Sequence, residues 1–266
     1  MSGAPLRLER ADDPRLAPYL ELRARAQQPD PARFVAESEH AVVRLLASGL
    51  AVESVLVEPA RAARLAALVP AGVPLYELEP ALLSEVLGFP LTRGAAACAR
   101  RPAPAPWPPA WLTERPRWRV LLAAGVADPV NVGLLCRNAR AFGVDQLLLD
   151  RAAGDPLARR AIRASIGQVF ALPWSRVADA RAALAALRQR CPDAQVLAAT
   201  LGPRALPLPR LTPPPRALLL VGQEEAGLDP ALVAECDQEV TIPIDPAVDS
   251  LNVAAAAAVL LYALGR

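Results

Sequence analysis

Short apolar segments alternate with helical segments through the second half of the chain, and this alternation constrains the fold more than any other feature. Residues 216–221 read Arg-Ala-Leu-Leu-Leu-Val and stop at Gly222. A strand without polar positions is typical of a parallel sheet whose two faces are both covered. Parallel strands need crossover connections, and the intervening helical segments supply that cover. The pattern predicts an α/β domain with a parallel sheet over residues 117–266.

The rest of the chain divides at a proline-rich segment. Residues 102–109 read Pro-Ala-Pro-Ala-Pro-Trp-Pro-Pro, which is typical of a stiff, extended linker. We therefore predict a domain over residues 1–101, a linker over 102–116 and the second domain over 117–266. Strand and helix patterns alternate in the first domain too, so it is predicted to be a small α/β layer structure. Trp107 and Trp111 are expected to pack on a domain surface rather than stack on bases.

The expected elements follow from periodicity and capping residues. Leu16, Tyr19, Leu20 and Leu22 suggest a short, loosely attached helix near the N-terminus. Strands are expected at 33–37, 52–57, 73–77, 119–124, 146–149, 195–200, 216–221 and 240–244, with another beginning at 169–171 and a strand or helix near 95–99. Helices are expected at 39–48, 60–68, 80–87, 130–142, 157–165, 179–190, 231–236 and 253–263.

Composition excludes several classes of protein. The four Cys residues form no C-x-x-C pair and there is a single His, His40, so neither a zinc site nor a disulfide framework is expected. The cysteines are expected to be reduced and partly buried. No segment has about 18 uninterrupted apolar residues, which predicts a soluble, cytoplasmic protein without a membrane partner. All 29 basic residues are Arg, so any charged contact to phosphate must come from guanidinium.

Three polar loops follow predicted strands of the second domain. The first carries Asn131, expected to cap a helix, and Arg137, which stands on an otherwise apolar helix and therefore needs a partner, either a ligand or an acidic side chain. The second is Gly222-Gln-Glu224-Glu-Ala-Gly227. Its glycines allow close backbone approach to a ligand at the end of a parallel strand, where α/β sheets bind ligands. A weaker loop of the same kind holds Thr200 and Gly202.

The third loop lies between residues 240 and 252 and joins a strand to the last helix. Ser250 stands where an N-cap is expected, and Asn252 is expected inside the first turn. A strand end, a polar loop and a helix N-terminus can form a pocket of backbone N–H groups. An ordinary capped strand-to-helix turn has the same pattern, so this stretch alone leaves both readings open.

The three loops in this order resemble the SpoU/TrmH family of SPOUT-class RNA ribose methyltransferases. Residues 131–143 resemble its first motif, 222–228 its second, and Ile242-Pro243 with Ser250-Leu-Asn-Val its third. Residues 163–167 match a segment between them. The first domain is similar to the ribosomal-protein-like substrate-binding domain of some members, on residues 34–37 and 88–94. It departs from that pattern at Ser38, where Gly is usual, and at Thr92, where His is common.

The resemblance implies a fold and an activity. The fold would be a parallel-sheet SPOUT domain with a C-terminal trefoil knot, and the enzyme would be a homodimer that borrows Arg from its partner. It would transfer a methyl group from S-adenosylmethionine to a ribose 2′-hydroxyl of RNA, with ribosomal RNA favoured over transfer RNA by the appended first domain. The implied catalytic residues are Arg137, Asn131, Glu224, Ser250 and Asn252. The implied cofactor-binding residues are Thr200, Gly202, Gly222, Ile242 and Leu251, and no metal is implied.

The residues leave alternatives open. A transfer RNA methyltransferase, an enzyme of the same class that modifies a base, and a non-catalytic RNA-binding protein on the same scaffold are each compatible with the fold. The intact set of polar residues argues against the non-catalytic protein. Arg137 beside the Ser250-Leu-Asn252 loop favours ribose over base.

Overall fold

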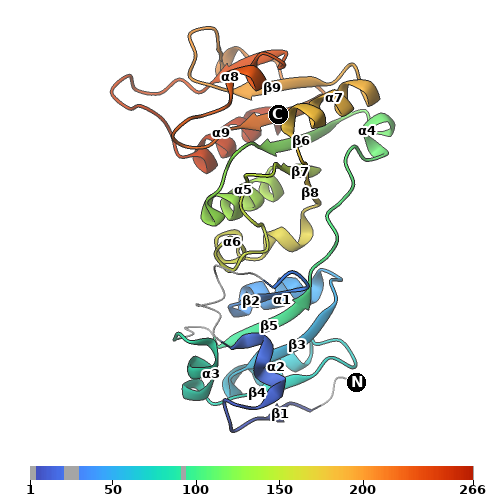
Figure 1. The fold of residues 1–266 in the computed structure, drawn as a ribbon, viewed down its shortest axis with the longest axis vertical. Coiled ribbons are helices and arrows are strands. Elements are labelled where there is room, and N and C mark those ends of the chain that lie inside the picture. Colours follow the sequence, from blue (N-terminus) through green and yellow to red (C-terminus); the bar gives the residue numbers. More distant parts are fainter. Residues whose placement is uncertain (1–3, 21–29, 91–93, 266) are drawn as a thin grey trace. The chain divides into compact units, whose positions relative to one another are not determined.

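The computed structural model describes residues 4–20, 30–90 and 94–265. The chain forms two compact units, shown as a ribbon in Figure 1. The first unit comprises Met1–Ala103 together with Leu157–Ala171, and the second comprises Pro104–Pro156 with Leu172–Arg266. No helix within the described ranges combines the length and apolarity that crossing a lipid bilayer requires.

The second unit is built on a seven-stranded sheet in the order β10-β12-β9-β11-β6-β7-β8. Every pairing in this sheet is parallel, which confirms the predicted parallel sheet. The strands are β6 (Trp118–Ala123), β7 (Gln146–Leu149), β8 (Trp174–Arg176), β9 (Gln195–Ala199), β10 (Leu206–Pro207), β11 (Arg216–Val221) and β12 (Gln238–Thr241).

Helices cover both faces of this sheet because its central strands have apolar residues at successive positions. Leu122 and Leu218 pack with α7 (Ala180–Arg190) and α8 (Pro230–Val233) in one buried cluster. Leu121 and Leu219 point to the opposite face and are also fully buried. On that face Arg119 Nε donates to the carbonyl oxygen of Leu264, 2.6 Å away in α9 (Val253–Gly265).

Helix α9 also packs against α5 (Pro129–Ala141), the helix that follows β6. Asn138 Nδ2 donates to the carbonyl oxygen of Ala254 at 2.7 Å, and the rings of Phe142 and Tyr262 meet edge to face with centroids 6.1 Å apart. Helices α5 and α9 are thereby held together. This contact brings the first and third sequence motifs to the same side of the sheet.

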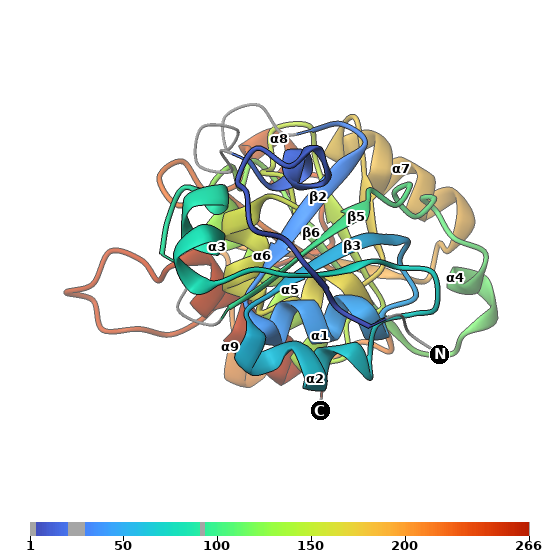
Figure 2. The same cartoon turned by 90° about the horizontal axis from the view of Figure 1, so that it is seen from below.

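The first unit has a mixed five-stranded sheet in the order β1-β4-β3-β5-β2, in which β5 runs antiparallel to β2 and β3. Figure 2 shows α1 and α2 on one face, with α3 and the 3-10 helix η1 on the other. The strands are β1 (Leu6–Arg7), β2 (Arg33–Glu37), β3 (Val52–Val57), β4 (Leu75–Glu77) and β5 (Ala95–Arg100); the helices are η1 (Pro14–Tyr19), α1 (Glu39–Ala47), α2 (Pro59–Ala66) and α3 (Pro80–Leu87).

A later segment of the chain completes this first unit. It contains α6 (Arg159–Ser165) and the 3-10 helix η3 (Gln168–Ala171). Arg159 forms an ion pair with Glu37 of β2, which is only 3% exposed, and its guanidinium lies 3.9 Å above the ring centre of Phe89. A carboxylate buried to this extent needs a partner, and Arg159 supplies it.

The linker is attached to the second unit along most of its length. Ala105 N donates to the carbonyl oxygen of Trp174, and Trp107 Nε1 donates to that of Ala183 at 3.1 Å. Trp107 and Trp111 both pack against the buried cluster of this unit, which confirms that they are packing residues. The short helix α4 (Trp111–Glu114) lies within the predicted linker.

Several sequence predictions were wrong in detail. Leu16 and Tyr19 are fully buried rather than loosely attached, and Tyr19 donates a hydrogen bond to the Ser54 carbonyl. Residues 168–171 are a 3-10 helix rather than the start of a strand. The last strand covers 238–241 instead of 240–244, because its register is set by pairing with β9. Leu22 and Thr92 lie outside the described residues.

Ser38 accounts for one departure from the family pattern. Its φ is 79°, in the left-handed region that glycine adopts most easily. The Ser38 hydroxyl accepts a hydrogen bond from Ala41 N at 3.4 Å and so caps α1. Serine at this position therefore combines a helix cap with a backbone conformation that a side chain disfavours.

Candidate functional site

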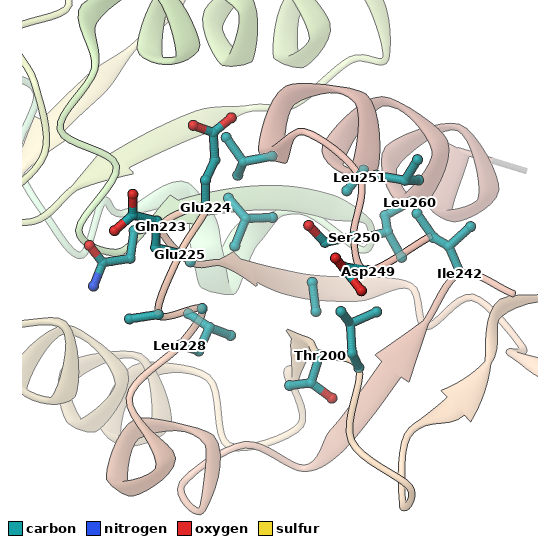
Figure 3. Close-up of a pocket in the computed structure, with 18 of the residues that line it drawn as sticks. Thr200, Gln223, Glu224, Glu225, Leu228, Ile242, Asp249, Ser250, Leu251 and Leu260 are labelled. Carbon is teal, nitrogen blue, oxygen red and sulfur yellow. The ribbon is translucent and has the colours of Figure 1, made fainter. Parts of the chain in front are cut away.

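A cavity of about 480 Å³ opens at the carboxyl ends of β9, β11 and β12. This volume falls within the range of about 300–1,000 Å³ that is typical of small-molecule sites. Figure 3 shows Thr200, Ile242, Ser250 and Leu251 around it, with Glu225 on the side away from Ile242. Its lining residues are Ala199, Thr200, Leu201, 221–228, Val240, Ile242, Ile244, 249–251, Val253, Ala256 and Leu260.

The charged groups of the cavity are all negative. Glu224, Glu225 and Asp249 line it, and the lining contains no Arg or His among the described residues. An anionic ligand would meet repulsion here, whereas a ligand with positive charge would be attracted. The remaining surface is largely apolar and comes from residues such as Leu228, Ile242 and Leu260. The cavity therefore suits a small cationic molecule with an apolar part.

The loop after β11 holds its shape because two glycines meet in it. A Cβ on Gly222 would lie 2.3 Å from both the carbonyl carbon and the oxygen of Gly227, so no larger residue fits. Gly227 N donates to the carbonyl oxygen of Gln223 at 3.0 Å, and Gly227 has a φ of 66°. This tight turn places Gln223, Glu224 and Glu225 on the rim of the cavity.

Asn252 joins three parts of the site through one side chain. Its Nδ2 lies 3.0 Å from Asn131 Oδ1 and 2.5 Å from Glu224 Oε1. Its Oδ1 accepts hydrogen bonds from Ala254 N at 2.9 Å and Ala255 N at 3.3 Å, at the start of α9. Asn252 therefore connects the first turn of α5, the loop after β11 and the N-terminus of α9.

This arrangement corrects two capping predictions. Asn252, and not Ser250, caps the last helix, because its side-chain oxygen reaches the unpaired N–H groups of the first turn. Asn131 lies inside α5 rather than at its cap: Asp128 precedes the helix and Pro129 starts it. Asn131 is 6% exposed, and its side-chain oxygen is occupied by Asn252 instead.

Arg137 does not belong to this hydrogen-bonded set. Its position on an apolar helix predicted a buried guanidinium that needs a partner. That prediction was wrong, because Arg137 is exposed on α5. Within the described part of the chain it forms neither a hydrogen bond nor an ion pair, so the expected acidic partner is not found either. A solvent-facing guanidinium on the same helix as Asn131 is available to a ligand from outside.

Most of the other predicted site residues line the cavity, and one does not. Thr200, Gly222, Ile242 and Leu251 line the cavity, as do Glu224 and Ser250. Gly202 does not line it. It lies next to Glu239 instead, because a Cβ there would come within 3.1 Å of that carboxylate.

Sequence reasoning missed Glu225 and Asp249 as cavity residues, and it missed the bond from Asn138 to α9. Glu225 stands inside the Gly222–Gly227 loop and could have been found from its position there. Cys136 on α5 is fully buried, and burial raises the pKa of its thiol to about 12, which makes it a poor nucleophile. No cluster of His, Cys, Asp or Glu that could hold a metal ion occurs among the described residues.

Comparison with known proteins assigns the second unit. A sequence profile of the SpoU rRNA Methylase family matches residues 119–262, which is more than half of the chain. The chain belongs to the SpoU family. The match covers the cavity, the Asn252 contacts and Arg137 together.

Other members of the SpoU family resemble the chain over nearly its whole length. A tRNA/rRNA methyltransferase of Mycobacterium bovis is 35% identical over 259 residues, covering 94% of this chain and 88% of that protein. The 23S rRNA (guanosine(2553)-2′-O)-methyltransferase RlmP of Bacillus subtilis is 27% identical over 257 residues, covering 97% and 98%.

Solved structures resemble both units as well. A crystal structure of an RNA 2′-O ribose methyltransferase superposes with a TM-score of 0.78 at 26% identity, covering 97% of this chain and 98% of that one. An AdoMet-bound rRNA methyltransferase from Sinorhizobium meliloti has the same fold, with a TM-score of 0.79 at 24% identity over 98% of each chain. The SpoU family assignment makes this protein an RNA methyltransferase.

Proposed function

We propose that this protein transfers a methyl group from S-adenosylmethionine to a ribose 2′-hydroxyl of structured RNA, with ribosomal RNA as its substrate. The observation that carries the proposal is the Asn131–Asn252–Glu224 set beside an acidic cavity, with the exposed Arg137 on the same helix as Asn131. Family membership and the 2′-O-methyltransferase names of two relatives support it.

The residues present in the cavity fit S-adenosylmethionine. Bound there, it would supply an electrophilic methyl group on a positively charged sulfur. Glu224, Glu225 and Asp249 offset positive charge, which suits both that sulfur and the ammonium of the amino-acid part. Thr200, Gly222, Ile242 and Leu251 would hold the molecule, and the small Gly222 leaves backbone groups accessible.

Arg137 would bind the RNA. Its guanidinium stays protonated in proteins, so we assign it a phosphate contact beside the target ribose instead of the role of general base. A fixed positive charge there also favours the ionised form of the nearby 2′-hydroxyl. Alignment of the two reacting groups can lower the barrier by several kcal/mol.

The remaining polar residues would position these groups. Asn252 fixes the Asn131 side chain through a 3.0 Å hydrogen bond, which leaves the Asn131 amide nitrogen available to orient Arg137 or the ribose. Glu224 accepts from Asn252 and so holds the loop after β11 against α9. Ser250 lines the cavity next to Asp249 and would complete its polar wall.

We further propose that the enzyme acts as a cytoplasmic homodimer. Helix α9 exposes Val259 at 42% and Tyr262 at 48%, and Leu251 at the adjoining rim is 36% exposed. Apolar residues on one face of an Ala-rich helix suit contact with a second copy. A partner's Arg would then complete the site, and the C-terminal trefoil knot expected from the family remains part of this proposal.

The first unit supports an RNA substrate of larger size than the catalytic unit alone would bind. We propose that residues 1–101 recognise RNA, with Pro-rich residues 102–116 joining them to a methyltransferase domain over 117–266. Two relatives are named as 23S rRNA 2′-O-methyltransferases, which favours ribosomal over transfer RNA.

The proposal is tested by calorimetry with S-adenosylmethionine, followed by methylation of total RNA and mapping of 2′-O-methyl groups in ribosomal and transfer RNA. Cofactor binding with methylation of ribosomal ribose is the expected result. Methylation of transfer RNA alone, or of a base, would correct the substrate. Binding of RNA without methyl transfer would indicate a non-catalytic protein.

Arg137→Ala isolates the proposed RNA contact. It should lower turnover at least 100-fold while cofactor affinity stays within about twofold, because Arg137 does not line the cavity. Arg140→Ala, at another exposed position of the same helix, is the matched control for loss of one positive charge. Turnover of Arg137→Ala within a few-fold of the wild type would remove Arg137 from the mechanism.

A further inference from the structure

Behind the cavity wall, Glu239 on β12 holds the side chain of Thr200. Thr200 Oγ1 donates to Glu239 Oε2 at 2.9 Å, and Thr200 N donates to the carbonyl oxygen of Val240 at 3.0 Å. The Glu239 side chain is 19% exposed and does not line the cavity, whereas Thr200 does. Both the backbone and the hydroxyl of Thr200 are therefore fixed by β12.

The direction of this hydrogen bond decides what Thr200 can offer a ligand. A carboxylate only accepts hydrogen bonds, and a threonine hydroxyl has a single proton to donate. With that proton committed to Glu239, Thr200 presents only oxygen lone pairs and a methyl group to the cavity. Arg204 Nε lies 3.8 Å from Glu239 Oε1.

The chemistry of the neighbouring wall indicates which ligand group belongs here. Ala199 precedes Thr200 in the chain and Val240 accepts its backbone hydrogen bond; both are apolar and line the cavity, as does Ile242. S-adenosylmethionine carries two groups that can only donate hydrogen bonds, its ammonium and the amino group of its purine. The ammonium is drawn to the carboxylates of the cavity, so the purine amino group is the donor left for an uncharged acceptor in an apolar wall.

We propose that Glu239 is a specificity-determining residue for the cofactor. By holding the Thr200 proton, it makes this edge of the cavity accept hydrogen bonds and so selects a 6-amino purine over a 6-oxo purine. Glu239 acts through Thr200 and is a positioning residue. The inference rests on the proposed use of S-adenosylmethionine.

The test compares two neutral ligands that differ at this group. Calorimetry would measure the dissociation constants of 5′-methylthioadenosine and 5′-methylthioinosine for the full chain. The variants are Glu239→Leu, which frees the Thr200 proton, and Thr200→Val, which removes the hydroxyl at nearly constant shape. Glu235→Gln, outside the cavity, controls for the loss of one carboxylate, and S-adenosylmethionine itself is titrated in parallel.

The wild type and Glu235→Gln should prefer the adenosine ligand about tenfold or more, because the 6-oxo group would face an acceptor with no proton between them. In Glu239→Leu and in Thr200→Val that preference should fall below about threefold. An undiminished preference in Glu239→Leu, or in Thr200→Val if the first variant does not fold, overturns the inference. A wild type that binds S-adenosylmethionine but shows no preference also overturns it, whereas failure to bind S-adenosylmethionine refutes the proposed function itself.

Discussion

Two substitutions at Asn252 separate the two functions of its side chain. Its Oδ1 caps α9 through Ala254 N and Ala255 N, while its Nδ2 donates to Asn131 and Glu224. Asn252→Asp keeps an oxygen at the cap and replaces the donor with a second oxygen. Asn252→Ala removes both functions. The pair therefore measures the helix cap and the site contacts independently.

The expected effects on stability differ between the two variants. Loss of an Asn cap costs about 1 kcal/mol, so the missing cap alone should lower the Tm of Asn252→Ala by about 2–4 °C. Asp is an equally good cap and its charge at a helix N-terminus contributes about 0.3–1 kcal/mol. That gain is offset by repulsion from Glu224. The new Asp oxygen would replace Nδ2, which in the wild type donates to Glu224 Oε1 at 2.5 Å. Both variants also lose the hydrogen bonds to Asn131 and Glu224, so the cap sets the difference between them: the Tm of Asn252→Asp should lie about 2–4 °C above that of Asn252→Ala.

Activity should fall in both variants. Asn252→Asp loses two donated hydrogen bonds, each worth about 1–1.5 kcal/mol, of which the bond to exposed Glu224 takes the lower figure. Together they correspond to a loss of turnover of about 30- to 70-fold. Asn252→Ala should lose a similar factor but without the repulsion. Methyl transfer to RNA under saturating cofactor, with thermal unfolding followed by circular dichroism, measures both quantities.

The control is Asp179→Ala, which removes the cap of α7 at a distance from the cavity lining. It should cost about as much stability as the loss of the α9 cap alone and leave turnover unchanged. If Asn252→Asp retains turnover within about twofold, the Asn131–Asn252–Glu224 set is only a helix-capping arrangement. The proposed positioning of Asn131 would then have no support.

Three further predictions follow from packing and burial. Gly222→Ala should abolish cofactor binding and lower stability by about 1–3 kcal/mol, because its Cβ would meet Gly227 at 2.3 Å; normal affinity by calorimetry would contradict this loop geometry. Glu37→Ala should destabilise the first unit by about 3–5 kcal/mol, since it leaves Arg159 without its buried partner, and denaturant unfolding would detect it. Cys136 should resist iodoacetamide at pH 8 in the folded protein and react only on unfolding, because burial raises its thiol pKa to about 12; rapid labelling followed by mass spectrometry would refute that burial.

Periodicity predicted the parallel sheet well because apolar strands carry their own signal. The strand over 216–221 and the helix over 80–87 match their predicted bounds, since Gly222 and Pro80 mark the ends locally. The last strand was misplaced because its bounds depend on pairing with β9, which the local sequence does not contain. Tyr19 was misjudged for the same reason, as its partner Ser54 lies 35 residues away.

The site was predictable in its residue types and less so in its contacts. Thr200, Gly222, Ile242 and Leu251, which the family motifs predict to bind the cofactor, line the cavity. The cap of α9 was assigned to the wrong residue, because both Ser250 and Asn252 are good capping residues and only the geometry distinguishes them. Glu239 could not be found from sequence, since its proposed role depends on a hydrogen bond from Thr200, which directly follows the neighbouring strand β9.

The assignment of Leu157–Ala171 to the first unit limits how the protein can be divided. Cutting the chain in the proline-rich linker would leave Glu37 without Arg159 and strip α6 from the sheet that it completes. The chain passes from one unit to the other three times, so neither unit is a continuous piece of sequence. Fragments ending near residue 103 should therefore expose apolar surface and aggregate, and an excised first unit would need residues 157–171 grafted back onto it.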